Sequence, residues 1–213
     1  MDLGFQVFNL TTYPHFVGML QELEIETEMS DMSFSLSLDG GKFEWSSDAV
    51  FGQATNALSP SFLRMLYDVL RFGREAPAVL HPTTASRYRD VTLGQYLTSK
   101  GYSQTFISKY VLPMCAAVWS VPVATCLEFP VTTLVQFWVN HHLLDVFERP
   151  LWRVISNRAE KYVEKIINVL PDVRLGAQVT VVRRGKHPKI TLSNGLNESF
   201  DAVVLVRGFV MIR

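Results

Sequence analysis

The sequence predicts a mixed α/β protein in which an apolar helical region separates sheet-forming segments at the two ends of the chain. Alternating apolar and small polar residues, typical of strands, occur around residues 33–45 and again beyond residue 150. Between them, over about residues 58–147, apolar residues recur at the spacing of helices. The composition, 48% hydrophobic and 19% charged in 213 residues, is that of an ordered globular protein.

The first residues of the chain predict a short strand followed by a helix. Leu3 to Phe8 is an apolar and aromatic run, for which an ordinary core strand is one reading. Thr12 is expected to cap a helix that carries Pro14 in its first turn.

A β-hairpin with one apolar face is expected next. Asp39-Gly40-Gly41 predicts its turn, because glycine adopts the backbone conformations that tight turns require. The apolar positions alternate with serine before the turn and continue after it: Phe34, Leu36, Leu38, Phe43 and Trp45.

Ser59-Pro60 is typical of the start of a helix. Its apolar face is expected to contain Phe62, Met65, Leu66, Val69, Leu70 and Gly73, with Arg64, Asp68 and Arg71 elsewhere. Residues 76–90, with two prolines and several hydroxyl side chains, predict a long surface loop.

Several short helices follow. Thr92 and Gln95 have the spacing of a capping box, Gly101 fits the position after a helix, and Ser103 is expected to cap the next one. Residues 110–144 are largely uncharged, long enough to raise the alternative of a membrane span. Prolines at 113, 122 and 130 interrupt a helix repeatedly, which favours a buried helical layer instead.

Sheet character returns after residue 150. Trp152 to Ile155 predicts a strand, and apolar residues over 159–170 mark an amphipathic helix. Val179 to Val182 and Ile190 to Leu192 are expected to form strands, with Asn194-Gly195 as a hairpin turn. The unbroken apolar run Ala202 to Val206 is typical of a strand buried in a parallel sheet.

Charge and motif content exclude several classes of function. Twenty basic and twenty acidic residues give zero formal net charge, which does not favour nucleic acid. Cys115 and Cys126 lie in apolar sequence and are expected to be buried free thiols in a reducing, cytoplasmic interior. The adjacent His141 and His142 diverge on a helix, so no metal site is expected. The sequence contains no G-x-S-x-G motif, which is typical of many hydrolases.

A set of short motifs carries a resemblance to a known family. They are Asp2-Leu3-Gly4-Phe5, Val7-Phe8-Asn9, Thr12-Tyr13-Pro14, 28–34, Thr92-Leu93-Gly94, Gly101-Tyr102-Ser103, Trp119-Ser120, 141–144, Arg149-Pro150 and Phe200-Asp201. With these motifs the chain resembles the FAD-dependent amine-oxidase-like family. It is most similar to the flavoprotein part fused to plant cyclopropane fatty acid synthases, which implies a possible methyltransferase-type fusion partner.

The resemblance implies a partial FAD-binding domain with an inserted helical substrate domain. In the family a βαβ unit with a G-x-G-x-x-G fingerprint precedes the segment that this chain resembles, and none of the 12 glycines here forms that fingerprint. The chain is therefore expected to be an internal fragment without the amino-terminal βαβ unit. The resemblance also implies that the opening segment shares a sheet with the valine-rich strands near the end of the chain. Residues 1–57 would form the FAD-domain edge and a substrate-domain hairpin, 58–147 the helical substrate region, and 148–213 the returning FAD-domain sheet.

The same resemblance suggests site residues. Gly4 and Phe5 would lie near the flavin, and Val179 matches a position whose backbone contacts adenine, the alternative being a valine of the strand core. Trp119 and Ser120 resemble a pair that faces the substrate, although a tryptophan there can serve packing instead. Residues 156–159 depart from the family, where a glycine is usual.

These features imply a fragment of an FAD-dependent oxidoreductase, which oxidises or desaturates a hydrophobic small molecule by hydride transfer to flavin. No catalytic residue is assigned, because the cofactor carries the chemistry in such enzymes. The alternative is a non-catalytic remnant that binds an apolar ligand or a protein partner without cofactor.

Overall fold

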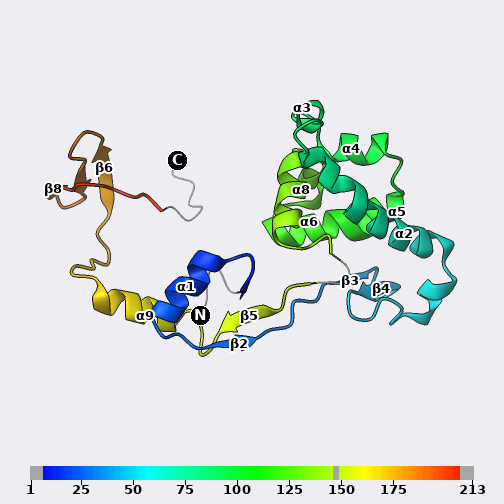
Figure 1. Cartoon of the computed structure of the whole chain (residues 1–213), viewed down its shortest axis with the longest axis horizontal. Coiled ribbons are helices and arrows are strands. Elements are labelled where there is room, and N and C mark those ends of the chain that lie inside the picture. The colour runs from blue at the N-terminus through cyan, green and yellow to red at the C-terminus, as the bar shows by residue number, and fades with distance from the viewer. Residues whose placement is uncertain (1–6, 146–148, 207–213) are drawn as a thin grey trace. The chain divides into compact units, whose positions relative to one another are not determined.

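The computed structural model describes residues 7–145 and 149–206. The chain forms two compact units, Met1–Tyr162 and Val163–Arg213. Its mixture of helices and strands confirms the predicted α/β class (Figure 1). The three-part division at residues 57 and 147 stays a prediction.

A small antiparallel sheet joins the two ends of the first unit. Its strands β1 (Phe8–Asn9), β5 (Trp152–Ile155) and β2 (Thr27–Met29) lie in the order β1-β5-β2. Phe8 pairs with Arg153, so β1 shares no sheet with the valine-rich strands near the end of the chain, and that prediction is wrong for the residues described. The reason is burial, since Phe8 packs with Leu20 and Ile155 in a core of its own.

Helix α1 (Pro14–Glu22) covers this sheet, but Thr12 does not cap it. Tyr13 occupies the N-cap position and its side chain makes no capping bond. Instead, Oδ1 of the buried Asn9 accepts hydrogen bonds from the main-chain N–H groups of Thr11 and Thr12, at 3.1 and 2.7 Å. The turn after β1 is thus held by a side chain that precedes the helix by several residues.

The predicted hairpin is confirmed by β3 (Ser35–Leu38) and β4 (Phe43–Ser46), in which Leu36 pairs with Trp45. Its turn places Asp39, Gly40 and Gly41 at positive φ. The indole of Trp45 stacks on Tyr110 at 5.7 Å and its Nε1 donates to the main-chain oxygen of Lys109 at 3.1 Å. The buried Trp45 therefore fastens the hairpin to the helical core, together with Phe43, which packs on Phe62 of the next helix at 6.0 Å.

The main helix, α2 (Pro60–Glu75), follows a 3₁₀ turn, η1 (Ala54–Leu58), and is capped by Ser59 as expected. Its buried face differs from the prediction. Asp68 is 0% exposed and Phe72 is buried, whereas Leu70 is 43% exposed. Hydrogen bonds from Ser103 and Arg64 to Oδ2 of the carboxylate, with Arg71 3.8 Å from Oδ1, allow Asp68 to occupy the core side of the helix.

Residues 76–90 are not a simple loop. They contain the 3₁₀ helix η2 (Ala76–Leu80) and the short helix α3 (Ala85–Tyr88). Ala76 and Val79 are buried in the hydrophobic core. Their apolar contacts stabilise helical turns that the prolines and hydroxyl side chains of the segment did not indicate.

The remaining helices of the first unit gather with α2 into one bundle (Figure 1). Both capping residues predicted here are confirmed: Thr92 with Gln95 at α4 (Leu93–Ser99), and Ser103 at α5 (Gln104–Phe106). Gly101 lies just after α4 at φ +66°.

The three prolines do not act alike. Pro122 and Pro130 precede α7 (Val123–Cys126) and α8 (Val131–Asn140), as expected of helix breaks. Pro113 does not break the helix, because a π turn, η3 (Ile107–Val111), leads directly into α6 (Leu112–Trp119). Within the described residues, no helix is long and apolar enough to cross a membrane.

The bundle core includes both cysteines, which are buried free thiols as predicted. Burial and a hydrogen bond with Cys126 raise the pKa of the Cys115 thiol. The Cys115 sulfur is therefore held in the neutral form at physiological pH.

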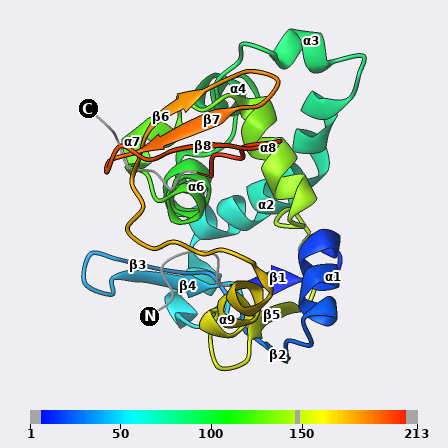
Figure 2. The same ribbon diagram turned by 90° about the vertical axis from the view of Figure 1, so that its left-hand side faces the viewer.

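Helix α9 (Glu160–Val169) spans the boundary between the units and confirms the predicted amphipathic helix. The second unit contains a three-stranded antiparallel sheet, β6 (Val179–Arg183), β7 (Lys189–Leu192) and β8 (Asn197–Ser199), drawn in orange and red in Figure 2. Asn194-Gly195 forms the turn between β7 and β8.

The run Ala202 to Val206 is not a strand, and its predicted burial in a parallel sheet is wrong. Val204 and Val206 are largely exposed. Every strand pair among the described residues is antiparallel, so no parallel neighbour is present there to bury the run.

Candidate functional site

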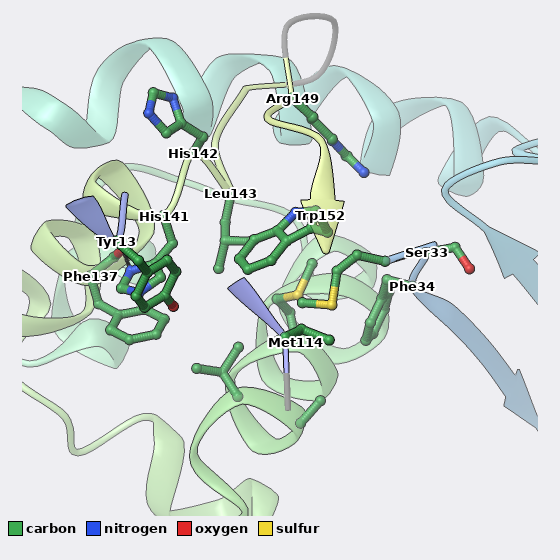
Figure 3. A pocket seen from close by; sticks show the side chains of 14 residues that line it. Tyr13, Ser33, Phe34, Met114, Phe137, His141, His142, Leu143, Arg149 and Trp152 are labelled. Carbon is green, nitrogen blue, oxygen red and sulfur yellow. Dashed lines mark hydrogen bonds between the residues drawn. The ribbon is translucent and has the colours of Figure 1, made fainter. Parts of the chain in front are cut away.

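A cavity of about 410 Å³ lies in the first unit. It opens among segments far apart in sequence: the turn before α1, the approach to β3, helix α6, the end of α8 and the start of β5 (Figure 3). Its described lining is Val7, Tyr13, Met32, Ser33, Phe34, Met114, Ala117, Val118, Phe137, His141, His142, Leu143, Arg149 and Trp152. Most of these side chains are apolar, as in sites for small organic molecules.

Aromatic rings form one wall of the cavity. The imidazole of His141 stacks on Phe137 at 3.9 Å between ring centres, and Tyr13 meets His141 edge-on at 5.7 Å. Trp152 faces Tyr13 from the other side at 6.5 Å. Burial raises the pKa of the Tyr13 hydroxyl, so this wall carries a neutral phenol at physiological pH.

The tautomer of His141 follows from its hydrogen bond. Its Nδ1 lies 2.8 Å from the main-chain oxygen of Phe137. A carbonyl oxygen only accepts, so Nδ1 carries a hydrogen and, in the neutral ring, Nε2 carries the lone pair. His141 can therefore accept a proton or a hydrogen bond at Nε2.

His142 has a different environment. It lies at φ +55°, and its Nδ1 is 2.8 Å from Oδ2 of Asp145. Figure 3 shows the two imidazoles directed away from each other. No group of three potential metal-ligating side chains occurs in the described part of the chain.

Arg149 lies at the rim of the cavity. Its Nε donates to the main-chain oxygen of Asp145 at 3.0 Å. A second cavity of about 400 Å³ adjoins the first and shares Phe34, Met114 and Arg149 with it. The guanidinium therefore stands where the two cavities meet.

Trp119 and Ser120 do not line the cavity. Trp119 packs behind it, on Phe137 at 4.9 Å and on Phe129 at 5.7 Å. Ser120 ends α6 in the left-handed conformation, at φ +52°, and is exposed. The contact with Phe137 links Trp119 to the cavity wall indirectly.

The residues expected near FAD are not brought together. Gly4 and Phe5 lie outside the described residues. Val179 begins β6 in the second unit and is 42% exposed. Where the family tends to have a glycine, Asn157 and Arg158 both adopt positive φ, so the glycine-like backbone is present without glycine.

The described residues do not by themselves fit a pyrophosphate group. The positive-φ glycines of the second unit, Gly176 and Gly195, lie in open turns with no atom within 4 Å of an added Cβ. A close cradle would crowd such positions. The fit of FAD to this chain alone is therefore incomplete.

The sequence predicts no functional role for Tyr13, Arg149 and Trp152, and no metal site at His141. Tyr13, His141 and Arg149 do occur in motifs that carried the family resemblance, which is the signal that could have identified them. Trp152 was recognised only as a strand residue. Their common location depends on the pairing of β1 with β5 and on the end of α8.

No protein-family model and no curated protein sequence matches the chain. Solved structures do. A triple mutant of a putrescine oxidase, made to redesign its cofactor binding, matches with a TM-score of 0.66 and 14% identity over 94% of this chain. The wild-type putrescine oxidase bound to putrescine matches with a TM-score of 0.65 at the same identity.

In both cases the chain spans 46% of the length of the neighbour. At this identity the likeness concerns the fold alone. It shows that the mixed α/β architecture of this chain corresponds to part of an amine oxidase, as the resemblance in sequence implied.

Proposed function

We propose that this chain is part of an FAD-dependent oxidoreductase of the amine-oxidase type, which oxidises or desaturates a hydrophobic substrate by hydride transfer to flavin. The observation that supports this best is the apolar cavity, because it lies in a unit whose fold corresponds to part of a putrescine oxidase. FAD, when bound, would supply the acceptor for the hydride.

The residues of this chain would bind the substrate and exclude water from it. Phe137, Trp152 and Met114 present apolar surface to the cavity. An apolar lining of this kind favours a hydrophobic ligand and strengthens electrostatic interactions inside the site. His141, with Nε2 as its lone-pair nitrogen, is the side chain best placed to take a proton from the substrate.

Flavin binding is the direct test. The purified full-length chain is titrated with FAD, and bound flavin is measured by its absorbance band and by the change in its fluorescence. Uptake of FAD in a defined ratio supports the proposal. A colourless chain that takes up no FAD contradicts it.

Val179 remains a proposed adenine contact. Val179→Trp would place a bulky ring where the adenine is expected and should weaken FAD binding, whereas Val181→Trp is a control at another exposed position of β6. Equal FAD affinity in the two variants would remove Val179 from the site.

The alternative is a remnant that binds an apolar ligand without cofactor. The incomplete fit to pyrophosphate favours it. A chain that binds an apolar probe and never FAD would support this alternative. The expected cytoplasmic location and methyltransferase-type partner stay predictions from the sequence.

A further inference from the structure

Among the described residues that line the cavity, Arg149 carries a fixed positive charge and none is Asp or Glu. An apolar site with an unbalanced charge at its rim selects ligands by the charge of their polar end.

The histidines do not contribute a free positive charge. His142 is already paired with Asp145, 2.8 Å away, so any charge that it carries is balanced. His141 donates from Nδ1 to Phe137 and stacks on the ring of that residue. Arg149 is thus the one permanent charge in the described lining.

The guanidinium of Arg149 has no carboxylate partner among the described residues. Its Nε is taken by the main-chain oxygen of Asp145, which leaves the two terminal nitrogens. Other arginines in the chain are paired differently: Arg64 and Arg71 with Asp68, and Arg174 with Asp172 and Glu198.

The adjoining cavity supplies one acid, Asp48, in its lining. Oδ1 of Asp48 accepts a hydrogen bond from the hydroxyl of Ser47 at 3.3 Å. No ion pair joins Asp48 to Arg149 within the described residues. The fork of terminal N–H groups on Arg149 therefore matches an external carboxylate, which such a fork can bind through two parallel hydrogen bonds.

We infer that the cavity takes an elongated apolar molecule ending in a carboxylate, with its body against Trp152 and Met114 and its carboxylate at the terminal nitrogens of Arg149. The inference deepens the proposed function by naming the chemical class of the substrate, and it rests on that function only for the claim that the ligand is oxidised. Putrescine, which the solved neighbour binds, carries two amino groups and would meet no carboxylate in the described lining.

A series of probes with one tail and three polar ends tests this. Decanoate, decanol and decylamine are titrated into the full chain without flavin, and binding is followed by calorimetry. Decanoate is expected to bind tightest, by roughly three- to tenfold over decanol, which is the range for a charge-assisted contact at an exposed arginine. Decylamine should bind weakest.

Arg149→Gln should lower decanoate binding to about the level of decanol binding, and Arg149→Lys should restore part of the preference for decanoate. Arg89→Gln is the matched control, because Arg89 is an exposed arginine outside the cavity. Circular dichroism confirms that each variant is folded.

The inference is overturned if no probe binds, if decylamine binds as tightly as decanoate, or if Arg149→Gln keeps the carboxylate preference. The result is separable from the proposed function, because the assay contains no flavin. If the chain prefers decanoate but takes up no FAD, this inference holds and the oxidoreductase proposal is contradicted. If the chain binds FAD but shows no preference for decanoate, the oxidoreductase proposal holds and this inference is contradicted.

Discussion

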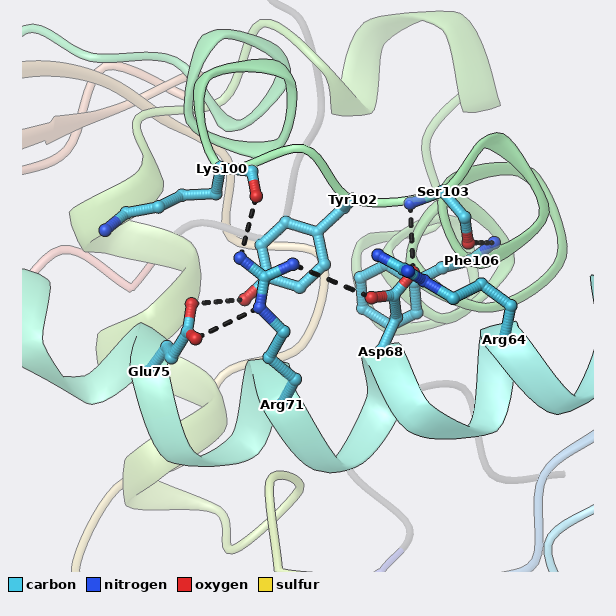
Figure 4. Close-up of polar contacts among 8 residues, drawn as sticks. All are labelled: Arg64, Asp68, Arg71, Glu75, Lys100, Tyr102, Ser103 and Phe106. Atoms are coloured by element: carbon cyan, nitrogen blue, oxygen red, sulfur yellow. Dashed lines mark hydrogen bonds and ion pairs between the residues drawn. The ribbon is translucent and has the colours of Figure 1, made fainter.

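Oδ2 of Asp68 accepts a hydrogen bond from the main-chain N–H of Ser103 at 3.0 Å, which joins the middle of α2 to the start of α5. Nε of Arg64 donates to the same oxygen at 3.2 Å, and Arg71 lies 3.8 Å from Oδ1 (Figure 4). Burial alone would raise the pKa of Asp68, but the bonds from Ser103 and Arg64 outweigh it, and the pKa lies below its ordinary value. The charged form of Asp68 thus holds two helices together.

Asp68→Asn should lower the free energy of unfolding by about 1–3 kcal/mol at neutral pH, because it weakens charge-assisted hydrogen bonds to a buried group. Chemical denaturation measures the loss. Asp90→Asn, at an exposed position, should have little effect. If Asp68→Asn leaves the free energy of unfolding unchanged, the charge of the Asp68 carboxylate does not contribute to stability.

The hydrogen bond between Asp68 and Ser103 also predicts that the stability of the fold depends on pH. A carboxyl whose pKa is lower in the folded than in the unfolded state stabilises the fold above its unfolded pKa, and this contribution is lost as the pH falls through the folded pKa. The difference in stability between the wild type and Asp68→Asn should therefore shrink below about pH 4. Denaturation curves over a series of acidic pH values test this, and a constant difference would contradict it.

Gly73 of α2 lies close to Leu144, in the segment that follows α8. A Cβ at Gly73 would lie 2.9 Å from the main-chain oxygen of Leu144, which is too short for an unstrained contact. Gly73→Ala should destabilise the chain by about 1–3 kcal/mol, although alanine is the better helix former.

Gly18→Ala in α1 is the matched control, because nothing lies within 4 Å of its added Cβ. That variant should gain about 0.5–1 kcal/mol from helix propensity. If the two variants change stability in the same direction, the close approach of Leu144 does not limit position 73.

Ala117 offers a way to close the cavity. It lines the cavity and is exposed, so Ala117→Trp can fill the space without disturbing the core. We expect decanol binding to fall at least about tenfold, since the apolar contact area would be lost. Ala124→Trp, on exposed α7, should bind decanol like the wild type.

The cysteines should be unreactive in the folded protein. Both are buried, and burial raises the pKa of Cys115, so little thiolate is present to attack a disulfide reagent. A thiol assay at mildly alkaline pH is expected to detect both thiols in denaturant and to react far more slowly without it. Rapid labelling of the native chain would show that the α6–α7 region opens.

Local signals in the sequence were sufficient where a residue acts on its immediate neighbours. Ser59, Ser103 and the Thr92–Gln95 pair cap helices as predicted, because a capping side chain reaches only to the first turn. The glycine turn of the first hairpin is likewise a local property.

Predictions failed where a distant partner decides the outcome. Asp68 is buried because Ser103, which lies 35 residues later, donates to it. Pro113 stays in a helix because a π turn precedes it. The apolar run 202–206 is exposed because apolar composition alone does not supply a neighbouring strand.

The sequence by itself determined the helix caps at Ser59, Thr92 and Ser103, the hairpin turns, the buried thiols and the mixed α/β class, since all of these depend on composition and short-range geometry. Only the tertiary structure brought Tyr13, His141, Arg149 and Trp152 around one cavity. Their meeting depends on the pairing of β1 with β5 and on the packing of α6, and such long-range contacts are set by the burial of the whole unit rather than by any one segment.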